Sequence, residues 1–297
     1  MKLLSVLLAV LSLFLNAASA QTDFVDGARL TSINAPWIIQ ILGNDLNITN
    51  VRVKPDERSA YFVLASDSTK LNVTVFIEPV LECETADECR ERVIKVEIAN
   101  WGKLENLTRG RLRDFSYFEF SRPQIAGQPA NVFDMQAEYV SDGYWVDVHI
   151  SKVDYTKNEH ALFEKVMNSI AILPKKNGAN NEYSPQLSMA NAAGSSWFSL
   201  WDSFKCKESY GVLSAPTRGE IKEKMWVDYC LQMNEGLGVN RYRKLIGSAF
   251  TRSPKSDGPI AILAYHSNFT KRSATVEVVG LTLEKNGTWT VSNYLAQ

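Results

Sequence analysis

Three side chains suited to a catalytic triad alternate along one short segment. Asp147, His149 and Ser151 lie in residues 144–153, which read as a β-strand, so the three side chains share one face. A triad needs direct hydrogen bonds, whereas neighbours on one strand face lie about 7 Å apart and point in parallel. We therefore predict a solvated sheet face here and no nucleophilic site.

A second set of candidate residues lies in the last third of the chain. A cavity between helix and sheet there would be lined by aromatic side chains, namely Trp197, Trp201, Trp226, Tyr229, Tyr265, Phe269 and Trp289. The polar groups expected near its mouth are Asp202, Arg243, Arg252 and His266.

Two interpretations of these residues stay open. An arginine pair binds a carboxylate or phosphate bidentately, which favours a ligand pocket. The alternative is that the aromatic side chains fill the core and that the arginines pair with Asp202 or Glu277 as a structural clamp. His266 lies in a predicted strand, where a histidine is more often structural than a general base.

The four cysteines predict disulfides and no metal site. Because Cys83 and Cys89 flank one short loop, and Cys206 and Cys230 both lie in the second half, we expect the pairs Cys83–Cys89 and Cys206–Cys230 among the three that are conceivable. Neither pair has zinc-knuckle spacing. The acids around the first pair, Glu82, Glu84, Asp87 and Glu88, lack the pattern of a calcium loop. With no phosphate loop or nucleophile elbow either, we expect no cofactor.

The first twenty residues have the features of a cleavable signal peptide. Lys2 precedes an apolar run over residues 3–15, and Ala18-Ser19-Ala20 offers a cleavage site, so the mature chain would begin near Gln21. The run is too short to span a bilayer, and no later stretch is long enough. We expect a soluble periplasmic or secreted protein, an environment that favours disulfides. A net charge of −1 argues against a nucleic-acid partner.

The length and composition predict two domains. We place them at residues 21–174 and 186–297, joined by a Gly- and Asn-rich linker at 175–185. The first has short strands at 36–42, 60–66, 71–76, 115–120, 132–139 and 144–153, and helices at 86–101 and 158–173, the latter capped by Thr156 and Glu159. This order predicts an α+β fold, an antiparallel α/β sandwich.

The second predicted domain separates its helices from its strands. One helix carries apolar residues from Ala193 to Phe204, and a second is expected after Thr217 and Glu220. Strands follow at 241–251, 260–269, 275–283 and 288–295, and Asn286-Gly287 predicts a tight hairpin in which both turn residues have positive φ. Helices followed by a four-strand meander indicate a cystatin-like or NTF2-like cone.

The second domain also resembles a known family. The similarity is carried by Ala190-x-x-Ala193-x-x-x-Trp197-x-x-x-Trp201-Asp202, Trp226, Arg243-x-x-x-Gly247-x-x-x-x-Arg252, Glu277-x-x-x-Leu281 and Glu284-Lys285-Asn286-Gly287-Thr288-Trp289-x-Val291-x-x-Tyr294. On these residues it resembles the DUF4019 family. The resemblance implies an exported domain with the cone fold and implies no established activity.

The first domain is similar, more distantly, to Mog1/PsbP-like sandwiches. The points of likeness are Phe76-Ile77-Glu78-Pro79, Tyr144-Trp145-Val146-Asp147-Val148-His149 and Ala161-Leu162-Phe163. This resemblance implies partner binding or an accessory role, although a shared fold does not transmit function.

These observations favour an exported, non-enzymatic accessory protein that binds a protein partner or a small ligand. The alternative is a hydrolase or isomerase that uses the pocket of the second domain, with His266 or Asp202 as the base.

Overall fold

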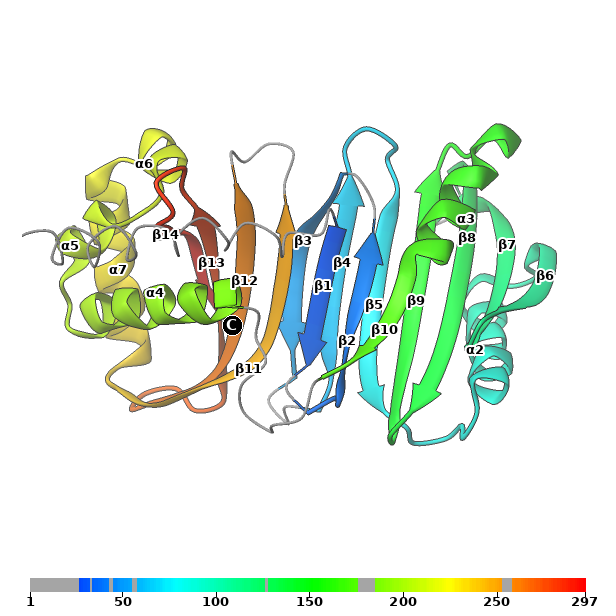
Figure 1. The fold of residues 1–297 in the computed structure, drawn as a ribbon, viewed down its shortest axis with the longest axis horizontal. Coiled ribbons are helices and arrows are strands. Elements are labelled where there is room, and N and C mark those ends of the chain that lie inside the picture. Colours follow the sequence, from blue (N-terminus) through cyan, green and yellow to red (C-terminus); the bar gives the residue numbers. More distant parts are fainter. Residues whose placement is uncertain are drawn as a thin grey trace, which may run out of the picture.

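The strands of this protein form two seven-stranded sheets, with helices at the two ends of the molecule (Figure 1). The computed structural model describes residues 27–32, 34–42, 45–54, 58–125, 128–175, 185–252 and 258–297, so the predicted signal peptide lies outside the described residues. Neighbouring strands of both sheets pair antiparallel, for example β1 with β11 and β8 with β9. The predicted α+β class with antiparallel sheets is confirmed.

The first sheet joins segments from both ends of the sequence. Its order is β10-β2-β1-β11-β12-β13-β14. The strands are β1 (Gly27–Ser32), β2 (Trp37–Leu42), β10 (Ile170–Pro174), β11 (Asn240–Arg252), β12 (Pro259–Phe269), β13 (Thr275–Leu283) and β14 (Trp289–Ala296). Because β1 pairs with β11, hydrogen bonding continues across the predicted domain boundary. The division into two domains stays a prediction about folding units.

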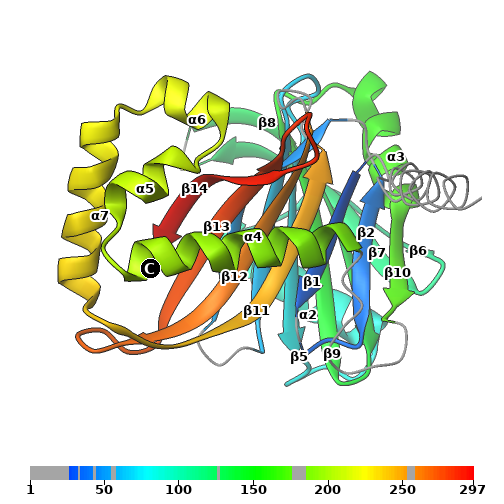
Figure 2. The same cartoon turned by 60° about the vertical axis from the view of Figure 1, so that its left-hand side comes forward.

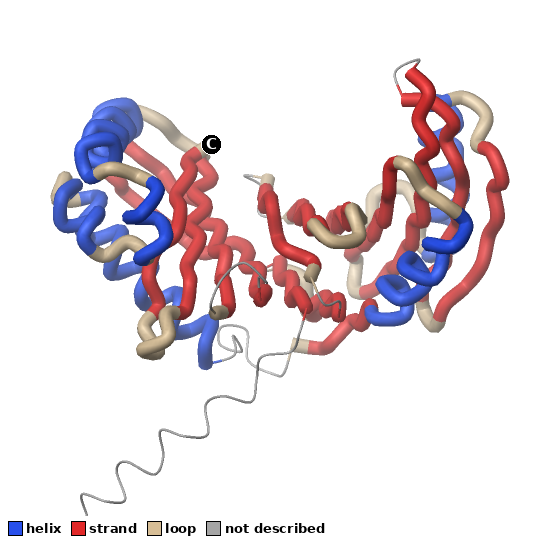
Figure 3. The backbone as a smooth tube through the Cα atoms, turned by 90° about the horizontal axis from the view of Figure 1, so that it is seen from above, coloured by secondary structure: helices blue, strands red, loops and turns tan. Residues whose placement is uncertain are grey.

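The second sheet is built from the first half of the chain alone. Its order is β3-β4-β5-β9-β8-β7-β6. The strands are β3 (Leu46–Val53), β4 (Ala60–Ser66), β5 (Asn72–Pro79), β6 (Glu105–Leu112), β7 (Phe115–Ile125), β8 (Gln128–Ser141) and β9 (Tyr144–Val153). Viewed from above, the strands lie between the groups of helices at the two ends (Figure 3).

One large core joins the two sheets. It combines Leu30 and Ile39 of the first sheet with Phe62 and Val148 of the second, all of them fully buried. At about 25 cal/mol for each Å² of apolar surface removed from water, this shared core is the main force that holds the sheets together.

The helices pack on different parts of the two sheets. Helix α2 (Ala86–Trp101) packs on β7 and β8, and α3 (His160–Ser169), after the 3-10 turn η1 (Lys157–Glu159), adds Phe163 to the shared core. The other helices are α4 (Pro185–Asp202), α5 (Cys206–Gly211), α6 (Ala215–Glu220) and α7 (Glu223–Leu237). Figure 2 shows α4 lying across the strands of the first sheet, with α5, α6 and α7 at one side of it.

The predicted helix over residues 158–173 is too long. Its capping box is present, because Glu159 Oε2 accepts from the Thr156 N–H at 2.8 Å. However, α3 ends at Ser169, and residues 170–174 form the edge strand β10, with Ile172 opposite Ile39. The β-branched alternation of this segment suits a strand, and pairing with β2 decides between the two conformations.

Two further local predictions are wrong in detail. Ser214 and not Thr217 caps the short helix α6, and α7 begins separately at Glu223. In the hairpin between β13 and β14, Gly287 has a φ of 82°, but Asn286 is not among the residues with positive φ. Asn286 instead accepts the Thr288 N–H through its side chain at 2.9 Å, which stabilises the turn without a left-handed asparagine.

Candidate functional site

Two of the four polar residues predicted near a pocket mouth, Arg243 and Asp202, form a structural clamp with Glu277. Arg243 on β11 donates to Asp202 Oδ2 at 2.7 Å and to Glu277 Oε2 at 2.7 Å, so one guanidinium serves two carboxylates. Glu277 is fully buried and also accepts from the hydroxyls of Tyr294, at 2.7 Å, and Ser267. Of the two interpretations that the sequence left open, a ligand pocket and a structural clamp, this geometry agrees with the clamp.

The surroundings of the clamp keep its charges in place. The Arg243 guanidinium lies 3.6 Å from the centroid of the Phe198 ring, which adds a cation–π contact. Burial opposes the charge on Arg243, but the hydrogen bonds that it donates to Asp202 and Glu277 outweigh burial and raise the pKa of Arg243. Burial, and then the charge of Glu277, raises the pKa of Tyr294 well above its usual value. These groups are therefore engaged with one another and are not poised for proton transfer.

Most of the aromatic side chains fill the core between the helices and the first sheet. Trp201 is fully buried, Trp226 is 4 % exposed, and their ring centroids lie 5.6 Å apart. Tyr265 is buried as well, and its hydroxyl donates to Asn191 Oδ1 at 2.8 Å. These rings pack against one another between the helices and the sheet.

The two candidate bases do not form one site. Along β12, Tyr265 faces the helices, so His266 points to the opposite face of the sheet, where it lies opposite Val276. Asp202 belongs to α4 and lies on the helical side. Arg252 ends β11, and its side chain lies outside the described residues. The acid and the imidazole named for the alternative enzymatic function are thus separated by the sheet.

A groove of about 680 Å³ opens beside this core. It lies between α4, the connection from α5 to α6, and the hairpin of β13 and β14; we call it the hairpin groove. Its apolar lining residues are Trp197, Leu200, Val212, Leu213, Trp289 and Val291. Two of the predicted pocket residues, Trp197 and Trp289, therefore line a cavity. This cavity lies on the outer side of the aromatic core and does not include the clamp residues.

The wall of the hairpin groove is fixed to the sheet. Ser214 N–H donates to Val291 O at 2.7 Å, and Leu213 bridges Val291 in parallel, so this segment covers part of the edge of β14. Glu284 Oε1 accepts from Thr290 Oγ1 at 2.9 Å and from the N–H of Ala215 at 3.3 Å. The predicted disulfide Cys206–Cys230 is present and ties α5 to α7 behind this wall.

Two cations, Arg218 and Lys285, line the hairpin groove, and the contacts of Arg218 define its orientation. Arg218 Nη1 donates to Gly211 O at 2.7 Å and to Leu213 O at 2.8 Å, which holds the guanidinium without any carboxylate. Within the described part of the chain no acid lies within ion-pair distance of it. One edge of the guanidinium is thus available for an anionic group.

A second polar cluster occupies the face of the second sheet that was predicted to be solvated, and that prediction is wrong. Asp147, His149 and Ser151 do share a face, but β8 places Glu138, Gln136 and Asp134 directly opposite them, and α2 covers this side of the sheet. The exposed fraction of Asp147 is only 9 %. The sequence alternation was correct, but it could not indicate that a helix packs over the polar face.

His149 binds a carboxylate other than the one named for a triad. Its Nε2 lies 2.8 Å from Asp134 Oδ1, and Arg122 binds the same fully buried carboxylate with Nε at 2.7 Å. Burial disfavours charging of His149, but the hydrogen bond with Asp134 and the charges of Asp134 and Asp147 outweigh it and raise the pKa of His149. Ser151 lies opposite Asp134 on the neighbouring strand, so no Ser–His–Asp relay is formed.

The carboxyl groups of Glu138 and Asp147 face each other across β8 and β9. Burial and then the charge of Asp147 raise the pKa of Glu138 well above its usual value. Burial, with the charges of Glu97 and Glu78, raises the pKa of Asp147 to about 7, while His149 acts in the opposite direction. Strongly shifted carboxyl groups of this kind mark candidate functional sites.

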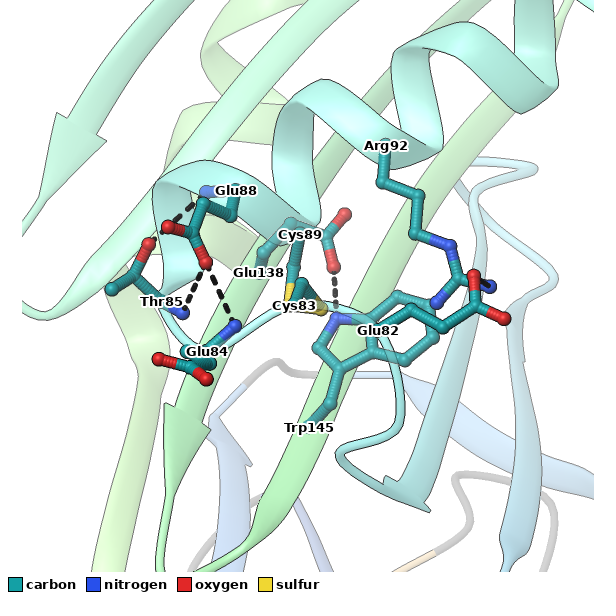
Figure 4. The surroundings of a disulfide bond; sticks show 9 residues. All are labelled: Glu82, Cys83, Glu84, Thr85, Glu88, Cys89, Arg92, Glu138 and Trp145. Carbon is teal, nitrogen blue, oxygen red and sulfur yellow. Dashed lines mark hydrogen bonds and ion pairs between the residues drawn. A yellow bond between two sulfur atoms is a disulfide. The ribbon is translucent and has the colours of Figure 1, made fainter.

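The acidic loop beside this pair stabilises the start of α2. Glu88 accepts the N–H of Glu84 at 2.8 Å and that of Thr85 at 3.3 Å, and the predicted disulfide Cys83–Cys89 closes the loop (Figure 4). Arg92 pairs with Glu82 at 2.6 Å. Among the residues that the structure describes, no group of three or more His, Cys, Asp or Glu side chains has the geometry to hold a metal ion.

Sequence reasoning missed three important residues. Glu138 and Asp134 lie on a strand whose alternation, Asp134-x-Gln136-x-Glu138, did indicate a polar face, so this signal was available. Arg218 carries no signal, because its role depends on the carbonyl groups of Gly211 and Leu213.

The comparisons with known proteins give a family for the C-terminal part. Residues 193–294 match the model of DUF4019, a family described as protein of unknown function, so the predicted resemblance is confirmed there. No curated protein matches the sequence.

Solved structures also resemble the chain. A solution structure of cyanobacterial PsbP (CyanoP) from Synechocystis sp. PCC 6803 is 15% identical, covers 53% of this chain and 99% of its own, and has a TM-score of 0.34. A protein from Bacteroides thetaiotaomicron VPI-5482 is 8% identical over 84% of this chain and 88% of its own, with a TM-score of 0.38. LpqN from Mycobacterium tuberculosis, described as involved in cell envelope biogenesis, is 14% identical over 50% of this chain and 92% of its own, with a TM-score of 0.27.

Proposed function

We propose that this protein is an exported, non-enzymatic binding protein whose hairpin groove takes an apolar ligand with an acidic head group. The observation that carries the proposal is the pairing of an apolar groove with Arg218, a cation held by backbone carbonyls at 2.7 and 2.8 Å. The residues that could do acid–base chemistry on the same side of the sheet are bound in the Arg243 clamp.

Export is supported by the sequence and by the disulfides. The apolar run over residues 3–15 and Ala18-Ser19-Ala20 predict signal cleavage, and both cysteine pairs are bridged. None of the helices in the described ranges has both the length and the apolar character needed to cross a membrane. Residues 186–297 would then form a cone-like domain of helices on a curved sheet.

The size and lining of the hairpin groove suit a small molecule. A volume of about 680 Å³ is within the range of small-ligand sites, about 300–1,000 Å³. Trp197 and Trp289 form the base of the groove and are only 2 % and 5 % exposed, whereas Val212 is 45 % exposed. A ligand gains hydrophobic free energy mainly by covering the exposed apolar part of the lining, such as Val212.

Arg218 supplies the selectivity for acids. Because Nη1 is engaged twice, its orientation is fixed before binding, and less side-chain entropy is lost when an anion arrives. Glu284, which also lines the groove, is turned to donors from Ala215 and Thr290. A carboxylate ligand would therefore meet the guanidinium of Arg218, in a groove that Lys285 also lines.

We expect decanoate to bind and to require Arg218. Replacing Arg218→Gln should weaken decanoate binding about 10–100-fold, because a charge-assisted hydrogen bond is worth about 1.5–3 kcal/mol. Tryptophan fluorescence measures the affinity, since Trp197 and Trp289 line the groove.

Two controls separate charge from apolar contact. Decanol, which has the same chain without the charge, should bind the wild type and Arg218→Gln within about twofold of each other. The variant Arg272→Gln removes an exposed arginine outside the groove and should leave decanoate binding unchanged. Equal affinity of the wild type for decanoate and decanol, or no binding of either, would refute the proposed ligand class.

A further inference from the structure

We propose that Glu138 and Asp147 form a proton-binding site that holds α2 and the Cys83–Cys89 loop on the second sheet, so that loss of the proton lets this cover open. The site lies in the other sheet from the hairpin groove, and the proposal does not depend on ligand binding.

The first observation is the geometry of the two carboxyl groups. Glu138 lies directly opposite Asp147 in the antiparallel register of β8 and β9, and Glu138 is fully buried. Side chains of directly opposed residues are about 4.5–5.5 Å apart at Cβ, so two negative charges would repel strongly at this depth. A proton held by the pair removes that repulsion.

The second observation is a set of buried acceptors without donors. Glu138 Oε1, Asp147 Oδ1 and the amide oxygen of Gln136 have no hydrogen-bond partner in the described structure. Gln136 is 2 % exposed and precedes Glu138 by two residues on the same face. A carboxylic acid proton supplies a donor to this group, whereas two carboxylates would add acceptors only.

The charged neighbours do not neutralise the pair. From α2, Glu97 adds negative charge. Arg90 acts to lower the pKa of Glu138, but it is itself engaged with Asp87 and Glu91 at 3.0 Å each, and the pKa of Glu138 stays raised. From β5, Glu78 adds further negative charge.

The remaining ionisable groups on this face satisfy each other. Arg122 from β7 and His149 from β9 both bind Asp134 of β8, at 2.7 and 2.8 Å. Trp145 donates to Glu138 Oε2 at 2.6 Å, which is the one hydrogen bond that the structure gives to this carboxyl group. The raised pKa values of Glu138 and Asp147 agree with this geometry.

The loop closed by Cys83–Cys89 and helix α2 contact the second sheet beside the Glu138 carboxyl group. Figure 4 shows the Glu138 side chain beside the Cys83–Cys89 disulfide, with its carboxyl group bonded to Trp145. Val93 and Ile94 of α2 pack on Phe118 and Phe120, and Glu97 accepts from Gln136 at 3.3 Å. Ionisation of the pair would require water, and water reaches it when the loop and the helix separate from the sheet.

Hydrogen exchange of the full-length protein tests this site. After correction for intrinsic rates, the opening constant of the amides in residues 83–101 should rise about tenfold for each pH unit between about pH 5 and about pH 7 in the wild type. In the double variant Glu138→Gln/Asp147→Asn it should stay constant within about threefold. Amides of β4, which lies in the shared core, report global unfolding, and opening of residues 83–101 should require less free energy than theirs at each pH.

Two results would overturn the proposal: equal opening of residues 83–101 at both pH values in the wild type, or the same rise in the double variant. If the double variant does not fold, infrared difference spectroscopy of the wild type decides. A carbonyl band of a protonated carboxylic acid should be present at about pH 5 and disappear above about pH 7. Its absence at about pH 5 contradicts the proposal.

Discussion

Replacing Arg243 with methionine is expected to cost the protein about 3–5 kcal/mol of its free energy of unfolding. Arg243 is 13 % exposed and is the cation for both Asp202 and Glu277. Without it, Glu277 stays fully buried as a charge that only the hydroxyls of Ser267 and Tyr294 contact. An uncompensated buried charge is far more costly than a lost surface ion pair.

The second variant in this test removes the orphaned charge. Adding Glu277→Gln to Arg243→Met should restore part of the stability, so that the double variant is more stable than the sum of the two single effects by about 1–3 kcal/mol. Arg272→Gln, an exposed arginine on a turn, should change the stability by less than about 0.5 kcal/mol. Urea unfolding measures the wild type, the two single variants, the double variant and the Arg272→Gln control. A loss below about 1 kcal/mol for Arg243→Met would show that the clamp is not structural.

The second large effect is a gain of stability at neutral to alkaline pH on replacing Asp147→Asn. In the folded protein burial raises the pKa of Asp147 to about 7, against about 3.9 in the unfolded chain. A raised carboxyl pKa contributes stability that is fully present below about pH 4 and is lost as the pH rises to about 7. Three pKa units correspond to about 4 kcal/mol, so at about pH 8 the variant should exceed the wild type by up to about 4 kcal/mol.

Urea unfolding at about pH 4 and about pH 8 checks this prediction. At about pH 4 the wild type and Asp147→Asn should have similar stability, because Asp147 is protonated in the folded state. The control is Asp114→Asn, an exposed aspartate in the turn between β6 and β7, which should show no difference that depends on pH. A variant that is less stable than the wild type at about pH 8 would mean that the Asp147 carboxylate is stabilised by groups other than those described.

His149 adds a smaller slope of the same sign. Its pKa is raised in the folded protein, so the stability from its bond with Asp134 is present below about pH 6.5 and lost as the pH rises through the folded value. The loss of stability caused by deprotonation of His149 should persist in Asp147→Asn. The slope that remains in this variant therefore separates the effect of the histidine from that of the carboxyl pair.

The elements with strong local signals were predictable from the sequence. The bounds of α2 at Ala86–Trp101, of β4 at Ala60–Ser66 and of β13 at Thr275–Leu283 are those expected from apolar periodicity. In each case the cap, the alternation and the flanking turn residues agree, and tertiary contacts reinforce the local preference.

The missed strands lack such signals. The segment Glu105–Leu112, which forms β6, carries Glu105, Asn106 and two arginines, and it becomes a strand because β7 offers it an edge to pair with. The pairing of β1 with β11 joins residues about 220 positions apart, and no local pattern specifies such a register.

The candidate sites were predictable to a smaller extent. The aromatic residues of the C-terminal part and the Arg243–Asp202–Glu277 grouping followed from spacing, and the clamp was one of the two open interpretations. The hairpin groove was not predictable, because the carbonyl groups that orient Arg218 come from the last residue of α5 and from the irregular segment after it. The proton site required knowing that α2 covers β8, which depends on packing between segments distant in sequence.

The location of the bound ligand is the most direct test of the proposed function. The chain has seven tryptophans, and their indole N–H signals can be assigned in a nitrogen-15 NMR spectrum by single substitution. Titration with decanoate should shift the signals of Trp197 and Trp289, which line the hairpin groove, and leave those of Trp101 and Trp145 beside the other sheet unchanged. If saturation with decanoate leaves the signals of Trp197 and Trp289 unchanged, or shifts the signals of Trp101 and Trp145 instead, ligand binding in the hairpin groove is contradicted.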